Sequence, residues 1–276
     1  MEARNLDPAV VESFGREWQK FDQSKLPEEE LRRLFEEYSC IFPWQTLPAG
    51  AVGFDLGCGS GRWARFVAPR VGELHCIDPS EALEVARQNL AAFPNCRFHR
   101  AGVDAIPLPD AAADFGYSLG VLHHLPDTQQ GLVDCVRKLK PGAPFLLYLY
   151  YAFDNRPWWF RTVWRASDLV RRVISRSPHW FKSAFAEVAA ALIYFPLARL
   201  AAWRERRGHN VDNWPLTAYR QRSFYEMRND ALDRFGTRLE KRFTRLQIEA
   251  MMRAAGLEQI QFSDTIFWCA IGLRKR

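Results

Sequence analysis

The chain has few cysteines and no spacing pattern among them. Its six cysteines are scattered, none forms a C-x-x-C pair, and no signal peptide precedes them. This distribution argues against a disulfide framework and a zinc site, and it predicts a reducing, cytoplasmic location. No cluster of Asp, Glu and His with ligand spacing occurs either, so we expect no bound metal.

Long uninterrupted hydrophobic runs are also lacking. The most apolar stretch, residues 184–203, contains Glu187, Pro196 and Arg199 within a length that barely spans a bilayer, so we do not predict a transmembrane helix. No internal repeat or low-complexity tract is present. At 276 residues and 48% hydrophobic content, the chain is long enough for one domain with a sizeable insertion.

What the sequence does have is localised basic charge and tryptophan. Residues 154–222 contain 13 Lys and Arg against 5 Asp and Glu, whereas the remainder contains 25 against 27. Six of the ten Trp lie in the same stretch. Anionic partners such as phosphorylated metabolites, nucleic acid or a lipid surface therefore have to be considered.

The hydrophobic pattern divides the chain into three parts. Residues 1–50 contain amphipathic helical runs, which predict an N-terminal helical cap. Short apolar strands alternate with helices over residues 51–151, and the pattern resumes at 243–276, which predicts an α/β fold with a doubly wound parallel sheet. Residues 152–242 interrupt the alternation and are expected to form a helical insertion, interpreted as a lid for substrate recognition.

A glycine-rich turn follows the first predicted strand. In GFDLGCGSGRW, residues 53–63, Gly57, Gly59 and Gly61 fall between a strand and a helix. Glycine there permits positive φ and close approach of a ligand to the backbone, and the helix start presents free N–H groups. Arg62 stands where a dinucleotide fingerprint prefers another glycine, which disfavours NAD.

Three further segments follow in register. Asp78 ends the second strand, where a carboxylate can accept hydrogen bonds from both ribose hydroxyls. Asp104 comes just after the third strand and is placed to bind an adenine amino group. The fourth strand closes with GVLHHLPD, which contains His123 and His124. These segments together indicate a nucleoside-containing cofactor.

On these motifs the chain resembles class I S-adenosylmethionine-dependent methyltransferases of the small-molecule type, similar to the ubiquinone and menaquinone enzymes. The resemblance covers about residues 50–151 and 243–276, through FDLGCGSG, IDPS, IPLPD, GVLHHLPD, LKPG and RAAGL. It implies a Rossmann-like, seven-stranded sheet with its last strand antiparallel. Ala143 departs from the pattern, since a second glycine is usual after LKPG.

The resemblance also implies a cofactor site for S-adenosylmethionine, with S-adenosylhomocysteine as product. The glycines would cradle the methionine part, Asp55 would orient their loop, Asp78 would hold the ribose and Asp104 would face the adenine. Leu119 and His124 would line the methyl end. The full predicted set is Asp55, Gly57, Cys58, Gly59, Gly61, Asp78, Pro79, Val103, Asp104, Leu119 and His124.

Methyl transfer requires a nucleophile held in line with the methyl group, and some acceptors also require a base. His123 and His124 are the candidate bases, because an imidazole titrates near neutral pH. Packing against the backbone is the alternative role for either residue. Strand alternation sends Tyr148 and Tyr150 to one face and Tyr151 to the other, and Tyr151 is the preferred substrate-facing tyrosine.

The insertion interleaves arginine with aromatic residues. Arg156, Arg161, Arg220 and Arg222 are placed to clamp a carboxylate or phosphate, and Trp158 or Phe224 to stack on an acceptor ring. A solvated basic face on lid helices is the competing interpretation. The substrate-binding prediction retains Arg156, Trp158, Arg220, Arg222 and Phe224.

A small-molecule acceptor with an oxygen, nitrogen or carbon nucleophile is the leading prediction. An RNA methyltransferase is a weaker alternative, because the N/D-P-P-Y/F string of base-amino methyltransferases is absent and LGVLHHLPD stands in its place. A third alternative has basic, aromatic helices docking on a membrane to reach a lipid or quinone. A non-catalytic scaffold is disfavoured by the intact glycine turn. The acceptor and the oligomeric state are not determined by the sequence.

Overall fold

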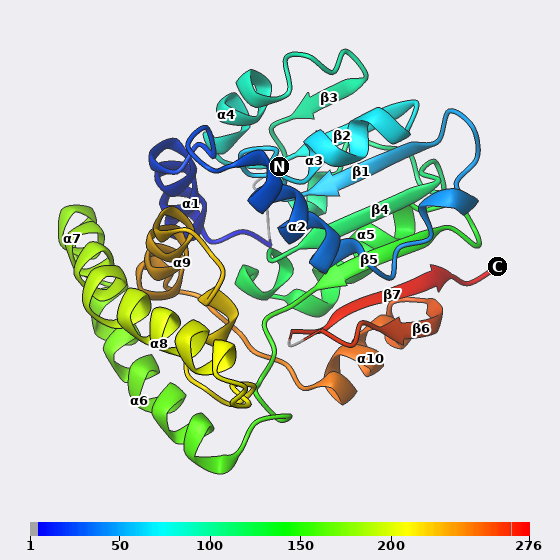
Figure 1. The fold of residues 1–276 in the computed structure, drawn as a ribbon. Helices are drawn as coiled ribbons and strands as arrows, with labels where there is room; N and C mark the ends of the chain where they lie inside the picture. The colour runs from blue at the N-terminus through cyan, green and yellow to red at the C-terminus, as the bar shows by residue number, and fades with distance from the viewer. Residues whose placement is uncertain (1–4, 266) are drawn as a thin grey trace. The chain divides into compact units, whose positions relative to one another are not determined.

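The computed structural model describes residues 5–265 and 267–276, and its central element is one seven-stranded sheet. The strands are β1 (Val52–Leu56), β2 (Glu73–Ile77), β3 (Cys96–His99), β4 (Phe115–Leu119), β5 (Pro144–Tyr148), β6 (Leu257–Phe262) and β7 (Cys269–Arg274). Their order is β3-β2-β1-β4-β5-β7-β6, and β7 runs antiparallel to both neighbours (Figure 1). This arrangement confirms the predicted Rossmann-like sheet with its antiparallel last strand.

Helices connect the strands and continue beyond them. The α-helices are α1 (Pro8–Lys20), α2 (Glu28–Ser39), α3 (Ala64–Val67), α4 (Ala82–Asn89), α5 (Thr128–Lys138), α6 (Trp158–Ile174), α7 (His179–Ala189), α8 (Phe195–Arg206), α9 (Phe224–Gly236) and α10 (Arg245–Ala254). Short polar side chains begin several of them: Asp7, Asp127, Ser223 and Thr244 each accept a hydrogen bond from a first-turn N–H group. Such caps satisfy backbone donors that the helix itself leaves open.

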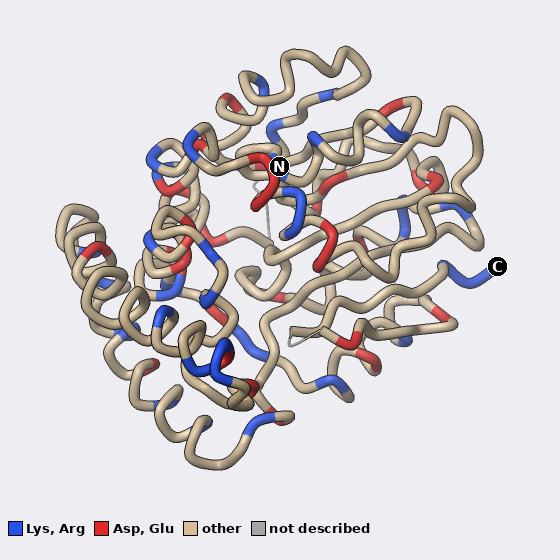
Figure 2. Tube along the Cα trace, in the orientation of Figure 1, with Lys and Arg blue, Asp and Glu red and all other residues tan. Residues whose placement is uncertain are grey.

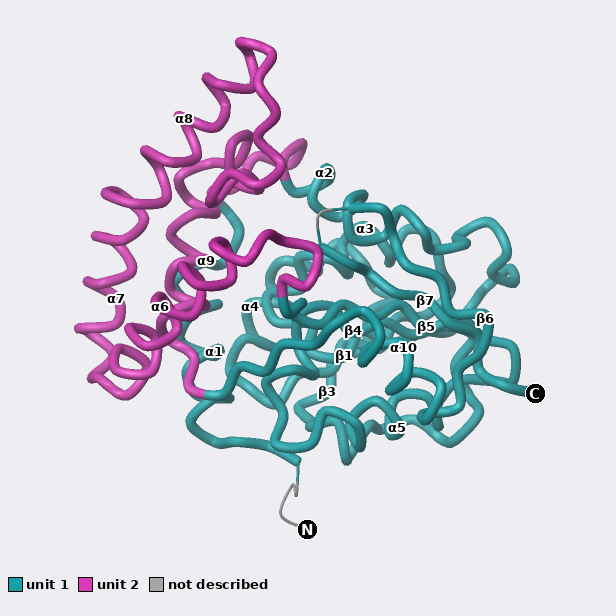
Figure 3. The backbone as a smooth tube through the Cα atoms, turned by 90° about the horizontal axis from the view of Figure 1, so that it is seen from below, with its two compact units in different colours: residues 1–24, 31–152, 239–276 teal, residues 25–30, 153–238 magenta. Residues whose placement is uncertain are grey.

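The chain divides into two compact units, which are described separately. Unit 1 comprises residues 1–24, 31–152 and 239–276, and unit 2 comprises residues 25–30 and 153–238 (Figure 3). The predicted insertion, 152–242, overlaps unit 2 for most of its length. The predicted N-terminal cap, 1–50, does not form a unit of its own, because most of it belongs to unit 1.

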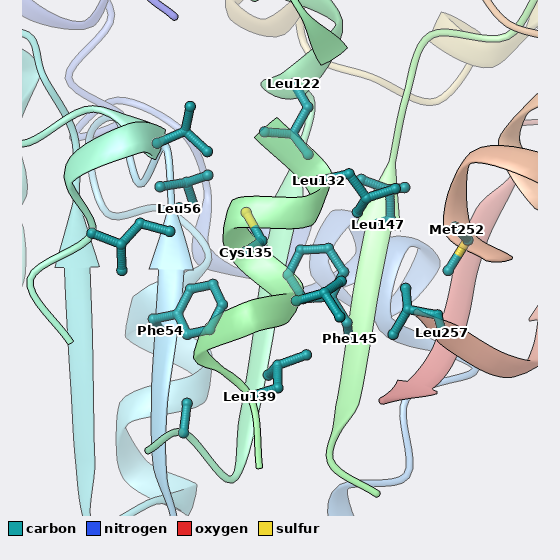
Figure 4. Close-up of a cluster of buried hydrophobic side chains, with 14 of the residues drawn as sticks. Phe54, Leu56, Leu122, Leu132, Cys135, Leu139, Phe145, Leu147, Met252 and Leu257 are labelled. Carbon is teal, nitrogen blue, oxygen red and sulfur yellow. The ribbon is translucent and has the colours of Figure 1, made fainter. Parts of the chain in front are cut away.

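The core of unit 1 lies between the sheet and the helices α5 and α10 (Figure 4). Phe54 and Phe145, on β1 and β5, are fully buried there with ring centroids 6.1 Å apart. Leu132 and Cys135 of α5 and Met252 of α10 pack against them. This packing explains why the sequence shows short apolar strands, as expected for a sheet covered on both faces.

The other face of the sheet carries a second set of aromatic residues. Phe42 and Trp44 pack edge-on against Phe115 of β4, with ring centroids 6.0 and 6.3 Å away. Phe35 of α2 stacks on Phe66 of α3 at 5.2 Å. Because helices cover both faces, only the ends of the strands remain for a ligand, as in other doubly wound folds.

Unit 2 consists mainly of α6, α7, α8 and α9. A π-helical turn over residues 190–194 joins α7 to α8, so that His179–Arg206 forms one continuous helix. Phe185 packs against Phe235 of α9 at 5.1 Å. Asp168 of α6 is buried and accepts hydrogen bonds from Arg171 at 2.7 Å and Arg172 at 2.9 Å. These contacts give unit 2 an interior of its own.

Candidate cofactor and methyl-transfer site

The glycine turn after β1 has the geometry that its sequence predicts. Gly57, Gly59 and Gly61 adopt φ values of +76°, +53° and +76°. Only glycine takes up such angles without strain. A Cβ atom at Gly57 would also come within 2.3 Å of Val121, so this position lacks space for a side chain as well. Cys58, between the glycines, is buried.

Asp78 is held in a single orientation beside this turn. Its Oδ2 accepts a hydrogen bond from the Gly59 N–H at 2.9 Å, and its Oδ1 accepts from the backbone N–H and the hydroxyl of Ser80 at 2.9 and 2.6 Å. Burial raises the pKa of the Asp78 carboxyl, while the hydrogen bonds from Ser80 and Gly59 act in the opposite direction. The ends of β1 and β2 are thereby tied together, and Pro79 follows directly.

Two more polar groups are buried beside the turn. Asp55, on β1, is 1% exposed, and burial raises the pKa of its carboxyl to about 8. The Ser60 hydroxyl is buried and has no hydrogen-bond partner among the residues that the structure describes. A buried polar group without a partner costs free energy, so its presence here is consistent with a polar ligand at this position.

The remaining predicted cofactor residues follow β3 and β4. Val103 and Asp104 lie in a 3-10 turn over Val103–Ala105, the first buried in the core and the second half-buried. Leu119 ends β4 and is buried. The structure thus places Asp55, Asp78, Asp104 and Leu119 after or near the carboxyl ends of four neighbouring strands.

The N-terminal segment lies across these same strand ends. Asn5 makes two hydrogen bonds of 2.8 Å with the backbone of Asp127, which follows β4. At the other end of the segment, Trp18 packs against the glycine turn: its Nε1 would be 2.9 Å from a Cβ atom placed on Gly59. Sequence reasoning predicted helices here but did not single out Trp18. Its spacing from the glycine turn gave no signal, because the contact is made only in the folded chain.

The two candidate bases differ sharply in their surroundings. His124 Nδ1 lies 2.7 Å from the carbonyl oxygen of Leu239, and a carbonyl can only accept, so Nδ1 carries the proton and Nε2 is the basic nitrogen. His123 is fully buried, and burial lowers the pKa of its imidazole well below the usual range. Both imidazoles are buried, and the hydrogen bond to Leu239 leaves Nε2 of His124 as its acceptor nitrogen.

The tyrosine nearest the histidines is Tyr150, whereas sequence reasoning preferred Tyr151. The rings of His123 and Tyr150 stack with centroids 3.8 Å apart, and His124 meets Tyr150 edge-on at 5.6 Å. The Tyr151 ring packs on Trp268 instead, at 5.8 Å. Strand β5 already ends at Tyr148, so Tyr150 and Tyr151 lie in the loop after it, and the loop decides which tyrosine is directed toward the histidines.

An arginine that the sequence analysis missed lies beside this cluster. The guanidinium carbon of Arg242 is 4.9 Å from the centroid of the Tyr150 ring, and its Nε donates to Glu240 at 2.8 Å. Its Nη1 also donates to the carbonyl oxygen of Tyr151 at 3.3 Å. Arg242 and Glu240 are separated from Tyr150 by about ninety residues of sequence, so no local motif joins them. The only sequence signal is their position just before the core resumes at residue 243.

The predicted substrate residues all belong to unit 2 and make contacts there. Arg156 donates to the Asp212 carbonyl oxygen, Arg220 donates to Glu205 at 2.9 Å, and Arg222 donates to the Ala218 carbonyl oxygen at 3.4 Å. Trp158 is 73% exposed, and Phe224 meets Phe195 edge-on at 5.8 Å. Their role in acceptor binding stays a prediction.

Comparison with known proteins decides the kind of domain. Residues 54–147 match the family model described as a methyltransferase domain. The chain carries a class I S-adenosylmethionine-dependent methyltransferase domain. The match covers the glycine turn, Asp78, Asp104 and both histidines, which are the residues that the structure gathers at the strand ends.

Individual relatives agree with this assignment. The 2-phytyl-1,4-naphtoquinone methyltransferase of Thermosynechococcus vestitus is 35% identical over 106 residues, which are 36% of this chain and 46% of that protein. The ubiquinone biosynthesis O-methyltransferase of Hahella chejuensis is 26% identical over 72% of this chain and 79% of that protein. The chain spans between 21% and 47% of the length of five curated relatives, of which the Thermosynechococcus enzyme is one.

A solved structure shares the fold. An O-methyltransferase family protein from Burkholderia thailandensis superposes with a TM-score of 0.56 and 14% identity, covering 99% of this chain and 64% of that one. This likeness extends over both units but concerns the fold alone.

The residues at the strand ends fit S-adenosylmethionine, the cofactor of this family. The positive-φ glycines leave the backbone accessible, the oriented Asp78 carboxylate suits a ribose diol, and the unpartnered Ser60 hydroxyl offers a further polar contact. Among the described residues, no group of three or more His, Cys, Asp and Glu is arranged to hold a metal.

Proposed function

We propose that the chain transfers a methyl group from S-adenosylmethionine to an oxygen, nitrogen or carbon nucleophile of a small-molecule acceptor. The observation that carries this proposal is the cluster of His123, His124 and Tyr150 after β4 and β5, next to the glycine turn that is expected to hold the cofactor. When bound, the cofactor supplies a methyl group on a sulfonium, which makes that carbon electrophilic.

His124 is the proposed general base. The cofactor would supply the methyl group and leave as S-adenosylhomocysteine, its carbon–sulfur bond being broken. His124 would take the proton that the acceptor loses at Nε2, the nitrogen left basic by the Nδ1–H that points at the Leu239 carbonyl oxygen. His123 and Tyr150 hold the neighbouring rings in place by stacking. An acceptor whose nucleophile carries no proton would not need His124.

Arg242 is proposed as a positioning residue for the same cluster. Its cation lies over the Tyr150 ring and, with Glu240, fixes the loop after β5. Loss of this cation would leave the Tyr150 ring less constrained and alter the surroundings of His123, since Arg242 contributes to the lowered pKa of that imidazole.

A small aromatic acceptor is favoured over RNA. The chemistry at the strand ends is aromatic and imidazole-rich, which suits a flat apolar ring with one reacting group. Two relatives are named for quinones, so phenols and hydroquinones stand first among the acceptors to be screened. Arg156, Trp158, Arg220, Arg222 and Phe224 are retained as proposed acceptor contacts in unit 2.

Thermal-shift titration tests the cofactor part of the proposal. We expect S-adenosylmethionine and S-adenosylhomocysteine to raise the unfolding midpoint and NAD to leave it unchanged, because a ligand that binds the native state stabilises it. A shift with NAD alone, or no shift with either adenosyl compound, would contradict the proposal.

Acceptor screening with mass-spectrometric detection of methylated product then tests the base. With an acceptor that loses a proton, His124→Gln should lower kcat by about 10²–10⁴-fold, the usual contribution of general acid–base catalysis. His209→Gln, at an exposed position of unit 2, is the matched control and should retain activity. Equal turnover of His124→Gln and wild type would remove His124 from the mechanism.

A further inference from the structure

Unit 2 exposes an unbroken series of apolar side chains on one long helix. Between Trp180 and Trp203, every exposed residue is apolar, and no charged side chain is among them. They are Trp180, Phe181, Ala184, Val188, Ala191, Leu192, Ile193, Phe195, Pro196, Leu200 and Trp203. Leu192, near the middle, is 72% exposed. Scattered apolar residues are normal on a protein surface, but a continuous series of this length marks an interaction site.

The exposed residues follow helical spacing. Phe181, Val188 and Leu192 are separated by seven and four residues, which places their side chains on one face of the helix. The opposite face is used inside unit 2, where α7 packs on α9 and Phe185 meets Phe235. We call the exposed face, from Trp180 to Trp203, the apolar stripe.

The exposed charges around the stripe are mostly basic. From residue 154 to residue 212, six arginines are exposed, against Asp154 and Asp212 at the two ends of that range and the Glu205 side chain, which is 38% exposed and paired with Arg220. These arginines are Arg161, Arg165, Arg172, Arg176, Arg206 and Arg207. Figure 2 shows basic positions along α6 and at the end of α8, with uncharged lengths of helix between them. The surface is therefore complementary to an anionic partner.

The acidic groups of these helices are neutralised within unit 2. Asp168 is buried against Arg171 and Arg172, and Glu187 accepts two hydrogen bonds from Arg228, at 2.5 and 2.8 Å. Glu205 of α8 is likewise paired, with Arg220 at 2.9 Å. The acids of these helices are thus matched by cations of unit 2, which leaves the exposed arginines in excess.

Trp180 and Trp203 mark the two ends of the stripe. The guanidinium carbon of Arg207 lies 3.9 Å from the centroid of the Trp203 ring. Tryptophan and arginine are the side chains that favour the boundary between lipid headgroups and acyl chains. A water-soluble protein partner would not call for this combination along the whole length of the helix.

The helix His179–Arg206 is long and apolar enough to cross a membrane, but its contacts favour lying in the surface of one. Lys182 donates to the Gly236 carbonyl oxygen and Arg199 donates to the carbonyl oxygens of Arg220 and Arg222. A spanning orientation would break these contacts and place Glu187 and Arg199 in hydrocarbon. Only one side of the helix is therefore available to lipid.

We propose that unit 2 docks on an anionic lipid bilayer through the apolar stripe, with the exposed arginines of α6 and of the α8 end contacting the headgroups. The stripe enters the boundary region of one leaflet, and the arginines supply the preference for anionic lipid. This proposal rests on unit 2 alone and is independent of the proposed acceptor.

Vesicle co-sedimentation of the full chain, without cofactor or acceptor, tests the proposal. We expect the wild type to sediment with vesicles of phosphatidylglycerol and phosphatidylcholine, and to sediment less with phosphatidylcholine alone or in high salt, since salt screens the arginines. Leu192→Glu should weaken binding by at least roughly tenfold, because it puts a charge into the apolar face. Leu246→Glu is the control, since Leu246 is 77% exposed on α10 of unit 1.

Two results would overturn the proposal. One is a wild type that fails to sediment with anionic vesicles, or a Leu192→Glu variant that binds as well as the wild type. The other is a wild-type dimer, seen by analytical ultracentrifugation, that Leu192→Glu dissociates while vesicle binding is absent, which would assign the stripe to a second copy of the chain. Circular dichroism and the thermal shift with S-adenosylmethionine establish that each variant is folded.

Discussion

Unit 1 and unit 2 treat polar and apolar groups in opposite ways. Unit 1 keeps Asp55, Asp78 and His123 buried at the carboxyl ends of its strands, and its apolar residues are enclosed by α5 and α10. Unit 2 buries Asp168 and Arg171 in its interior and leaves a row of large apolar side chains in contact with solvent. In unit 1, the unfavourable contribution to folding free energy comes from polar groups removed from water. In unit 2, it comes from apolar side chains left in water.

This difference indicates where each unit meets its partner. A buried carboxylate or hydroxyl is stabilised when a polar ligand of matching shape, such as a nucleoside cofactor, forms hydrogen bonds with it. A row of exposed apolar side chains is stabilised when a partner of any detailed shape removes it from water. The first favours a specific small ligand and the second favours an extended surface.

The largest expected loss of stability comes from a substitution in the interior of unit 2. Asp168→Ala removes the carboxylate that balances the buried Arg171 cation and leaves it only the carbonyl oxygens of Thr237 and Arg238, so we expect the free energy of unfolding to fall by about 3–5 kcal/mol. Urea unfolding measures the change. Asp212→Ala, at an exposed acid of the same unit, should change stability by no more than about 0.5 kcal/mol. Equal effects of the two substitutions would mean that unit 2 lacks a polar interior of its own.

The next largest expected loss of stability comes from substitutions at two glycines of unit 1, which separate backbone strain from steric clash. Gly57→Ala adds a Cβ within 2.3 Å of Val121 at a φ of +76°, and we expect a loss of about 2–4 kcal/mol from backbone strain and overpacking together. Gly142 has a φ of +80° with nothing within 4 Å, so Gly142→Ala should cost only about 1–2 kcal/mol. Thermal unfolding compares them, and an equal loss would argue against the tight packing of the glycine turn.

A smaller effect concerns ligand binding in unit 1. Asp78→Ala removes the carboxylate expected to hold the ribose, so the affinity for S-adenosylmethionine should fall at least roughly tenfold, about 1.4 kcal/mol. Isothermal titration calorimetry measures the change. Asp110→Ala, which removes an exposed carboxylate bonded to Lys138, is the control and should leave affinity unaltered. Unchanged affinity in a folded Asp78→Ala protein would contradict the assignment of Asp78.

A further expected effect is a pH dependence of stability. Because the pKa of Asp55 is raised to about 8, the folded chain keeps this carboxyl protonated between its ordinary value of 3.8 and about 8, whereas the unfolded chain ionises it. The folded state then binds more protons, so the contribution of Asp55 to stability is lost as the pH rises through this window. Asp55→Asn should remove that slope.

Thermal unfolding at several pH values between 5 and 8 compares Asp55→Asn with the wild type. The wild type should lose stability relative to the variant as the pH rises. In Asp110, hydrogen bonding to Lys138 lowers the pKa of the carboxyl, so Asp110→Asn should show no such trend above pH 5. Parallel curves for wild type and Asp55→Asn would show that Asp55 is ionised in the folded chain.

Much of the fold followed from local pattern. The alternation of apolar strands and helices predicted the doubly wound sheet, and the glycines at 57, 59 and 61 predicted a turn that the structure shows at positive φ. Asp78 was predicted to end the second strand, and it directly follows β2, which ends at Ile77. These features depend on backbone geometry and burial over a few neighbouring residues, so the local sequence is enough to predict them.

The composition of the site after β4 and β5 was not predictable in the same way. Tyr150 and Tyr151 are adjacent in the sequence, and only the path of the loop after Tyr148 places the first against His123. Arg242 reaches Tyr150 only because the chain returns to unit 1 after unit 2. Contacts between residues about ninety positions apart carry no local periodicity and are decided by packing.

The sequence by itself determined the doubly wound sheet and the glycine turn after its first strand, because an alternating apolar pattern and glycines at positive φ each satisfy a local physical requirement. The tertiary structure decided which histidine nitrogen is basic, which tyrosine lies beside it and which face of the long helix stays uncovered. Those outcomes depend on which surfaces are buried when distant segments meet, and burial is a property of the folded chain.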